Sequence, residues 1–191
     1  MLLALDGANR VGFRVRIAEP RHDRKKFGTI GVRHRSQTAD YHAVVKLGGS
    51  DPYGLTRFVG AQEGVFEQAL AEIRAGRKRS HWMWYVFPQF KGLGSSPTSI
   101  EYAIGSVEEA QAYLAHPILG PRLRQCAEAA LQIEGLSALE VFGSPDDMKL
   151  RSSATLFAAV SSDGSVFHRL IDKYFDGKPD ARTIELLTRA R

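Results

Sequence analysis

The segment RKRSHWMWYVFPQFKGLGSS, at positions 77–96, gathers side chains that can bind and process a small molecule. His81 can act as a general acid or base near neutral pH. The neighbouring indole rings can stack on a flat ligand, and each keeps an N–H donor. We take His81 as the candidate catalytic residue. The candidate binding residues of this stretch are Lys78, Ser80, Trp82, Trp84 and Gln89.

The same stretch also fits an aromatic core in which His81 is bonded to a backbone carbonyl. Its secondary structure is ambiguous, because the residues WMWYVF have high strand propensity while a short helix capped by Ser80 also fits. In either geometry much of one face is buried. Core packing and a cleft wall therefore both remain open for this segment.

A glycine-serine loop, KGLGSSPTS, follows the aromatic residues. Gly92 and Gly94 can adopt positive φ and expose backbone N–H groups, Ser95 adds a hydroxyl, and Pro97 is expected to begin a helix. Such a loop can hold an anion. It matches neither a Walker loop nor G-x-G-x-x-G, so a plain connecting turn is the alternative.

A third group lies far along the chain, in SPDDMKLRSSATLF at positions 144–157. On a helix, Lys149, Ser152 and Ser153 fall on or beside one turn, where they can converge on a phosphate or carboxylate. The alternative is a solvated face of ion pairs, with Asp146 near Lys149 and Asp147 near Arg151 at helical spacing.

Other catalytic patterns are missing from the sequence. The six histidines lie far apart, and neither an H-E-x-x-H motif nor a cysteine pair is present, so we predict no metal site and no cofactor. The chain also lacks G-x-S-x-G and S-x-x-K. Its single cysteine, Cys126, lies on an apolar helical pattern that favours a buried structural thiol.

Composition and charge divide the chain near residue 50. A charged fraction of 25% and an apolar fraction of 43% are typical of a folded domain. Residues 1–50 carry ten Lys and Arg against four Asp and Glu, a net +6, whereas the rest of the chain is near neutral. We expect this basic extension to be disordered or a start-site artefact, with translation beginning at Val44 or Val45. We do not expect nucleic acid as a partner except through this extension.

Residues 51–191 are expected to form one compact all-α domain of about seven or eight short helices. Apolar residues from Leu55 to Ile73 recur at three and four residue spacing, which predicts a single helix ending at Gly76. Helix starts are signalled by Ser106 with Glu109 and Ser137 with Glu140 as capping boxes, by Ser144 with Pro145, and by Pro117 and Pro179.

Several strings occur in an order that resembles the bacterial DUF1810 family, also called the Rv1873-like superfamily. They are SHWMW, FPQ, YLAHPILGPRLRQC and KLRSS, and the resemblance covers residues 51–187. It implies an all-helical fold and supplies no catalytic residues. Some members carry the name calpastatin, which implies a protease inhibitor with disordered inhibitory segments, and the capped helical pattern argues against that role.

Two hypotheses of function follow. In the first, an aromatic and basic cleft binds or processes a nucleotide-like or phosphorylated small molecule. In the second, the domain is a non-catalytic protein-interaction module. A pocket formed by His81, Trp84, Gln89, Lys149 and Ser152 would favour the first, and an exposed apolar groove the second. No segment predicts a membrane span or an export signal, so we expect a cytoplasmic protein whose partner is an anionic small molecule.

Overall fold

The computed structural model describes residues 50–190, and the basic extension expected at residues 1–50 lies almost entirely outside them. The described part is helical, as predicted, and its only β-type pairing is an isolated bridge between Phe90 and Ile104. None of its helices is long and apolar enough to cross a membrane. The helices are α2 (Thr56–Gln62), α3 (Phe66–Arg74), α4 (Met83–Val86), α5 (Pro97–Glu101), α6 (Val107–Ala115), α7 (Leu119–Leu131), α8 (Ala138–Phe142), α9 (Asp146–Ala158), α10 (Val166–Phe175) and α11 (Ala181–Arg189).

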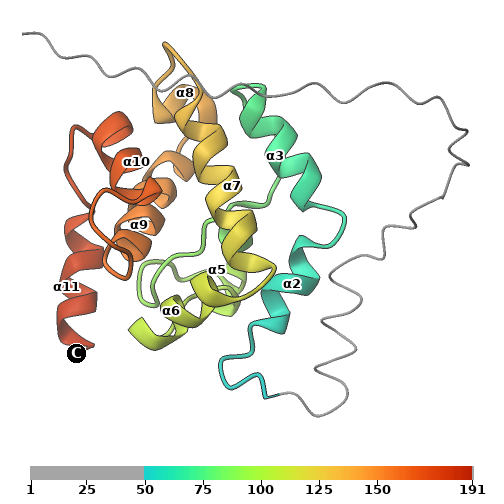
Figure 1. The fold of residues 1–191 in the computed structure, drawn as a ribbon, viewed down its shortest axis with the longest axis vertical. Helices are drawn as coiled ribbons and strands as arrows, with labels where there is room; N and C mark the ends of the chain where they lie inside the picture. The colour runs from blue at the N-terminus through green and yellow to red at the C-terminus, as the bar shows by residue number, and fades with distance from the viewer. Residues whose placement is uncertain (1–49, 191) are drawn as a thin grey trace, which may run out of the picture. The chain divides into compact units, whose positions relative to one another are not determined.

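Helix α7 lies at the centre of this arrangement. It packs against α3 on one side, against α10 on another and against α6, and Figure 1 shows it running between the α3 side and the α9–α10 side. Its buried face includes Leu123, Cys126 and Ala127, none more than 1% exposed. Gly120 permits the close approach of the preceding turn, because a Cβ atom there would lie 2.1 Å from the Leu114 carbonyl oxygen.

The single helix predicted over residues 55–73 is wrong, because the structure divides it into α2 and α3. Glu63 is extended and Gly64 has a φ of +70°, a left-handed conformation that glycine adopts at low cost. The apolar stripe continues on both helices, so periodicity alone did not show the break. The predicted stop at Gly76 is confirmed by its positive φ. This division and the one-turn helix α4 account for part of the difference between ten described helices and the seven or eight expected.

Capping explains several helix starts, with one departure from prediction. Ser137 and Glu140 form the full capping box at α8. Ser106 accepts a hydrogen bond from the Glu109 N–H at the start of α6, but the Glu109 carboxylate bonds Gly105 instead of the cap residue. The second half of that predicted box is therefore absent, and the other carboxylate oxygen of Glu109 pairs with an arginine.

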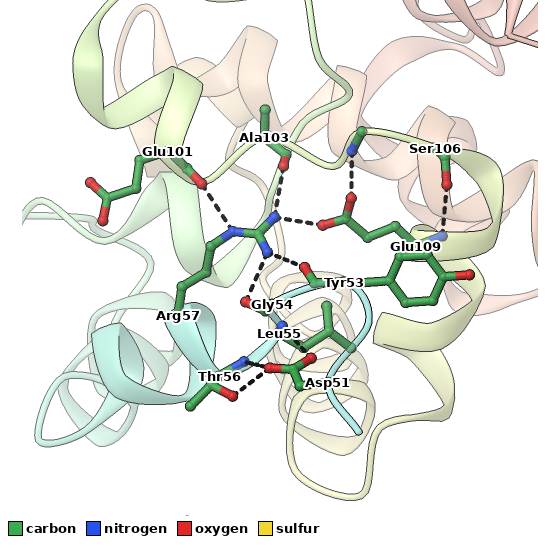
Figure 2. A network of polar contacts seen from close by, with 11 residues as sticks. Asp51, Tyr53, Gly54, Leu55, Thr56, Arg57, Glu101, Ala103, Ser106 and Glu109 are labelled. Atoms are coloured by element: carbon green, nitrogen blue, oxygen red, sulfur yellow. Dashed lines mark hydrogen bonds and ion pairs between the residues drawn. The ribbon is translucent and has the colours of Figure 1, made fainter. Parts of the chain in front are cut away.

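That arginine, Arg57 of α2, joins the start of the domain to the segment between α5 and α6 (Figure 2). Its Nη2 atom lies 2.5 Å from Glu109 Oε1, and the carboxylate is 9% exposed. The remaining guanidinium contacts are to the backbone oxygens of Tyr53, Gly54, Glu101 and Ala103. A planar group with five fixed donors suits this position, where carbonyls approach from several directions.

Replacing Arg57 with Met should lower the free energy of unfolding by about 2 kcal/mol, because several backbone acceptors and the carboxylate of Glu109 lose their partner. The matched control is Arg169→Met, which breaks a pair with Glu128 whose two side chains are 51% and 48% exposed. That change should cost no more than about 0.5 kcal/mol. Urea unfolding followed by circular dichroism measures both, and equal losses would contradict the role of Arg57.

Candidate functional site

The site is built around the carboxylate of Glu72, on the last turns of α3. It accepts hydrogen bonds from the Arg79 N–H at 2.8 Å, from the N–H and hydroxyl of Ser80 at 3.0 and 2.7 Å, and from the indole N–H of Trp82 at 2.8 Å. Burial raises the pKa of Glu72, but these four donors outweigh it and lower the pKa from 4.5 to about 2. One charged group thereby fixes the path of the chain into α4.

Trp82 is a core residue. Its side chain is fully buried, and its ring makes an edge contact with Phe142 at a centroid distance of 6.4 Å. Its indole N–H donates to Glu72, so the one polar group of this buried side chain has a hydrogen-bond partner. The core interpretation therefore holds for Trp82, and the ring cannot stack on a ligand from this position.

The aromatic stretch is a single helical turn, so neighbouring side chains point in different directions. Met83 and Val86 enter the core, while Trp84 is only partly buried. The Lys149 ammonium lies 4.1 Å from the centroid of the Trp84 ring, a cation–π distance. The HWMW and KLRSS motifs, distant in sequence, therefore meet in space through this pair.

A second lysine reaches the same place. Asp146, at the start of α9, lies 2.5 Å from the Lys78 ammonium and 2.7 Å from the Lys149 ammonium. All three side chains are at most 17% exposed. Burial raises the pKa of Asp146, but the two ammonium groups outweigh this and hold it below its ordinary value. Two positive charges against one negative leave this cluster with a net charge of +1.

A pocket of about 470 Å³ opens beside Trp84 and Lys149. Its volume lies within the range of about 300–1,000 Å³ that small-molecule sites occupy. Four chain segments contribute to it: α4 with the residues that follow, the glycine-serine loop with α5, α9, and the start of α11. The lining residues are Trp84, Gln89, Leu93, Gly94, Ser95, Ser96, Ser99, Pro145, Met148, Lys149, Ser152, Asp180 and Arg182.

Polar contacts fix one wall of the pocket. The side-chain nitrogen of Gln89 lies 2.6 Å from the Ser152 hydroxyl, which in turn donates to the Lys149 carbonyl at 3.1 Å. Ser152 is only 3% exposed, so this link is held inside the protein. Gln89 therefore faces the pocket from an anchored position.

Another part of the lining comes from α11, which the sequence did not connect to the site. Asp180 caps α11 through the N–H and hydroxyl of Thr183, and its own N–H bonds the Thr155 hydroxyl of α9 at 2.8 Å. Arg182, on the first turn, brings a second cation to the lining. Nothing at the sequence level indicated these residues, because α11 is far along the chain and reaches the pocket through tertiary packing, mainly on α9.

Arg151 helps to hold this wall, and its predicted pairing with Asp147 is wrong. Its guanidinium turns to the backbone oxygens of Lys178, at 3.0 Å, and Pro179. The helical spacing allowed the pair, but the carbonyls of the segment before α11 provide the acceptors instead. The predicted neighbour pair Asp146–Lys149 is confirmed.

The glycine-serine loop takes only part of the shape that its composition suggested, because Gly92 has the expected positive φ and Gly94 does not. Gly92 has a φ of +96° and lies against Leu186 of α11, and a Cβ atom on Gly94 would come within 2.6 Å of Ser99. Ser96 caps α5, which begins at Pro97 as predicted. Gly94 and Ser95 line the pocket, whereas Gly92 supports the loop from behind.

Six of the eleven predicted binding residues line this pocket: Trp84, Gln89, Gly94, Ser95, Lys149 and Ser152. Lys78 forms an ion pair with Asp146, and the Ser80 hydroxyl donates a hydrogen bond to Glu72. Ser153 is fully buried, and its hydroxyl has no hydrogen-bond partner among residues 50–190. His81 has an exposed side chain outside the lining, and its carbonyl accepts from the Tyr85 hydroxyl at 2.7 Å. The structure thus joins the motifs without bringing His81 to the pocket.

Two other expectations concern metal and thiol chemistry. Among residues 50–190, no three His, Cys, Asp or Glu side chains gather in a way that could hold a metal ion. Cys126 is fully buried, as predicted, and burial raises the pKa of its thiol to about 12. A thiol in that state is a poor nucleophile at neutral pH.

The known proteins that this chain resembles have no assigned function. Residues 52–187 match the family model described as "Protein of unknown function (DUF1810)". The crystal structure of the conserved hypothetical protein Rv1873 from Mycobacterium tuberculosis is similar, with a TM-score of 0.71 and 54% sequence identity. That match covers 72% of this chain and 99% of the other. No curated protein matches the sequence.

The low pKa of Glu72 makes a prediction about acid stability. Because the folded-state value of about 2 lies below the ordinary 4.5, its contribution is complete above pH 4.5 and is lost as the pH falls from about 4.5 to about 2. Glu72→Gln should lower the free energy of unfolding by about 2 kcal/mol at neutral pH, since the charge-assisted hydrogen bonds weaken.

Denaturant titrations at neutral pH and at several acidic values measure this effect. The difference between wild type and Glu72→Gln should shrink as the pH falls through that window. Glu134→Gln, at an exposed position, serves as the control and should stay within about 0.5 kcal/mol of wild type. A difference for Glu72→Gln that is constant with pH would rule out the charge of Glu72 as its cause.

Proposed function

The chain belongs to the DUF1810 family, and we propose that it uses the pocket beside Trp84 to bind an anionic small molecule that carries a flat ring. The observation that supports this most is convergence. A tryptophan and a glutamine from the α4 segment, a lysine from α9 and an arginine from α11 reach one pocket. Binding sites typically combine an apolar wall with a few oriented polar groups, and this lining has both.

Charge favours an anion. Among the lining residues Lys149 and Arg182 are positive and Asp180 is negative, so the lining carries a net +1. The carboxylate of Asp180 is turned to Thr183 as a helix cap. Asp146 partly balances Lys149, but it is shared with Lys78. Arg182 pairs with Glu185, and these two side chains are 52% and 43% exposed. Because exposed ion pairs are weak, this pair can open to let a phosphate or carboxylate group reach Arg182.

Apolar side chains supply the surface for the ring. Trp84 is partly buried, and Leu93 and Met148 line the same pocket. Met148 is 63% exposed, which leaves a flexible thioether at the edge of the pocket. Lys149 lies over the Trp84 ring, so an anion drawn to that ammonium arrives beside an aromatic surface.

Binding fits the site better than catalysis. His81, the acid or base expected from the sequence, lies outside the lining. Lys149 is paired with Asp146, and Asp180 is occupied as a cap. General acid–base catalysis needs a titratable group within hydrogen-bond reach of the reacting atom. We accordingly propose a binding or sensing role for this pocket.

A second candidate function, protein interaction, has a separate location. A hollow of about 700 Å³ lies between the ends of α3 and α7 and is larger than the pocket beside Trp84. Leu136 lines it and is 39% exposed, and Leu139 nearby is 55% exposed. Exposed apolar side chains favour a protein partner. We rank it second because its charged residues, such as Arg74 and Glu134, are solvent-exposed and not held in place by a buried network.

Isothermal titration calorimetry with inorganic phosphate, pyrophosphate and adenosine monophosphate tests the proposed function. We expect at least one of these anions to bind the wild type, and Lys149→Met to weaken that binding about tenfold, the value of one charge-assisted hydrogen bond of about 1.4 kcal/mol. Lys178→Met is the control, because its side chain is 72% exposed and it removes the same charge outside the lining.

Tryptophan fluorescence gives an independent measurement of the same binding. The chain has two tryptophans, of which Trp82 is fully buried and Trp84 lines the pocket. A change in emission on binding should therefore disappear in Trp84→Phe. Failure of all three anions to bind, or equal weakening by Lys149→Met and Lys178→Met, would contradict the proposed function.

A further inference from the structure

The hydroxyl of Ser152 determines which way the Gln89 amide points. The Ser152 oxygen lies 3.1 Å from the Lys149 carbonyl, which carries no proton and can only accept. The hydroxyl proton must therefore point to that carbonyl. The lone pairs of Ser152 are left to face Gln89, and they require an N–H donor at 2.6 Å. The NH₂ group of Gln89 must accordingly point at Ser152.

With its nitrogen held by Ser152, Gln89 presents its side-chain oxygen as an acceptor. No described residue donates a hydrogen bond to that oxygen, and Gln89 forms part of the pocket lining. For the amide to present its NH₂ group instead, the Ser152 hydroxyl would have to leave the Lys149 carbonyl and donate to the Gln89 oxygen, at the cost of one hydrogen bond. The pocket therefore offers one fixed acceptor beside the Trp84 ring.

We propose that this acceptor selects ligands whose flat ring carries an N–H donor, which makes an amino-substituted nucleobase with an attached phosphate the preferred class of ligand. The inference rests on the proposed function, because it assigns a role to Gln89 in the same pocket. In this arrangement Trp84 stacks on the face of the ring, and the Gln89 oxygen accepts a hydrogen bond from its amino group. Lys149 and Arg182 bind the phosphate.

A ligand that lacks the amino group leaves the Gln89 oxygen without a partner. A site built to hydrogen-bond a ligand group discriminates strongly against an analogue without it, because a desolvated polar atom is then unpaired. Adenosine monophosphate and purine riboside monophosphate form a matched pair of probes. They share the sugar, the phosphate and the fused ring, and they differ by the exocyclic amino group.

Calorimetric titration of the wild type with each nucleotide tests the selection. Adenosine monophosphate should bind about tenfold more tightly than purine riboside monophosphate, which corresponds to one hydrogen bond. In Ser152→Ala the amide of Gln89 is free to rotate, and the preference should fall to about threefold or less. Gln89→Leu, with Ser152 left intact, removes the acceptor and should abolish the preference for adenosine monophosphate.

The outcomes separate this inference from the proposed function. Equal affinities of the two nucleotides for the wild type, or a full tenfold preference retained in Ser152→Ala, would overturn the role of Gln89. If neither nucleotide binds while pyrophosphate binds in a manner that depends on Lys149, the inference is overturned and the proposed function stands. If no anion binds at all, both are overturned. Thermal unfolding of each variant shows whether the fold is intact.

Discussion

One largely buried carboxylate, that of Asp146, holds together the parts of the molecule on which the pocket depends. It lies between the ammonium groups of Lys78 and Lys149, and each lysine lies over an indole, Trp82 for the first and Trp84 for the second. The segment before α4 is thereby tied to the first turn of α9. A buried ion pair is costly to break on one side only, because the remaining charge is left unpaired. The position of Trp84 relative to α9 is consequently fixed by electrostatics as well as by packing.

Much of the fold could be predicted from the sequence because helix signals are local. Ser96, Ser106 and Ser137 each cap a helix as their neighbours indicated, and Gly76 ends α3. The break at Gly64 could not be predicted from the apolar pattern, since α2 and α3 keep the same spacing of buried residues across it. A glycine inside a periodic segment is compatible with a continuous helix or with a left-handed turn, and tertiary packing decides between them.

For the candidate site, too, the sequence indicated residue types but not the contacts between distant segments. Residue types indicated that Trp84, Gln89, Lys149 and Ser152 could act together, and the structure brings them to one pocket. The sequence could not separate the roles of Trp82 and Trp84, because that depends on the direction of a single helical turn. It also gave no signal for Arg182, which is far along the chain and reaches the pocket through the packing of α11 on α9.

The placement of Arg182 on α11 has a consequence for how this family can diversify. Helix α11 has two buried residues, Thr183 and Leu187, while Arg182 and its neighbours on the outer face are exposed. Substitutions at exposed positions usually change stability by about 0.5 kcal/mol or less. The charge and shape of that wall can therefore drift between related chains at little cost to folding. Lys149 and Trp84 lack that freedom, because the Asp146 cluster binds them to the interior. Under the proposed function, one cation that contacts the anionic group, Lys149, is thus held by the interior, while the other, Arg182, can vary between related chains.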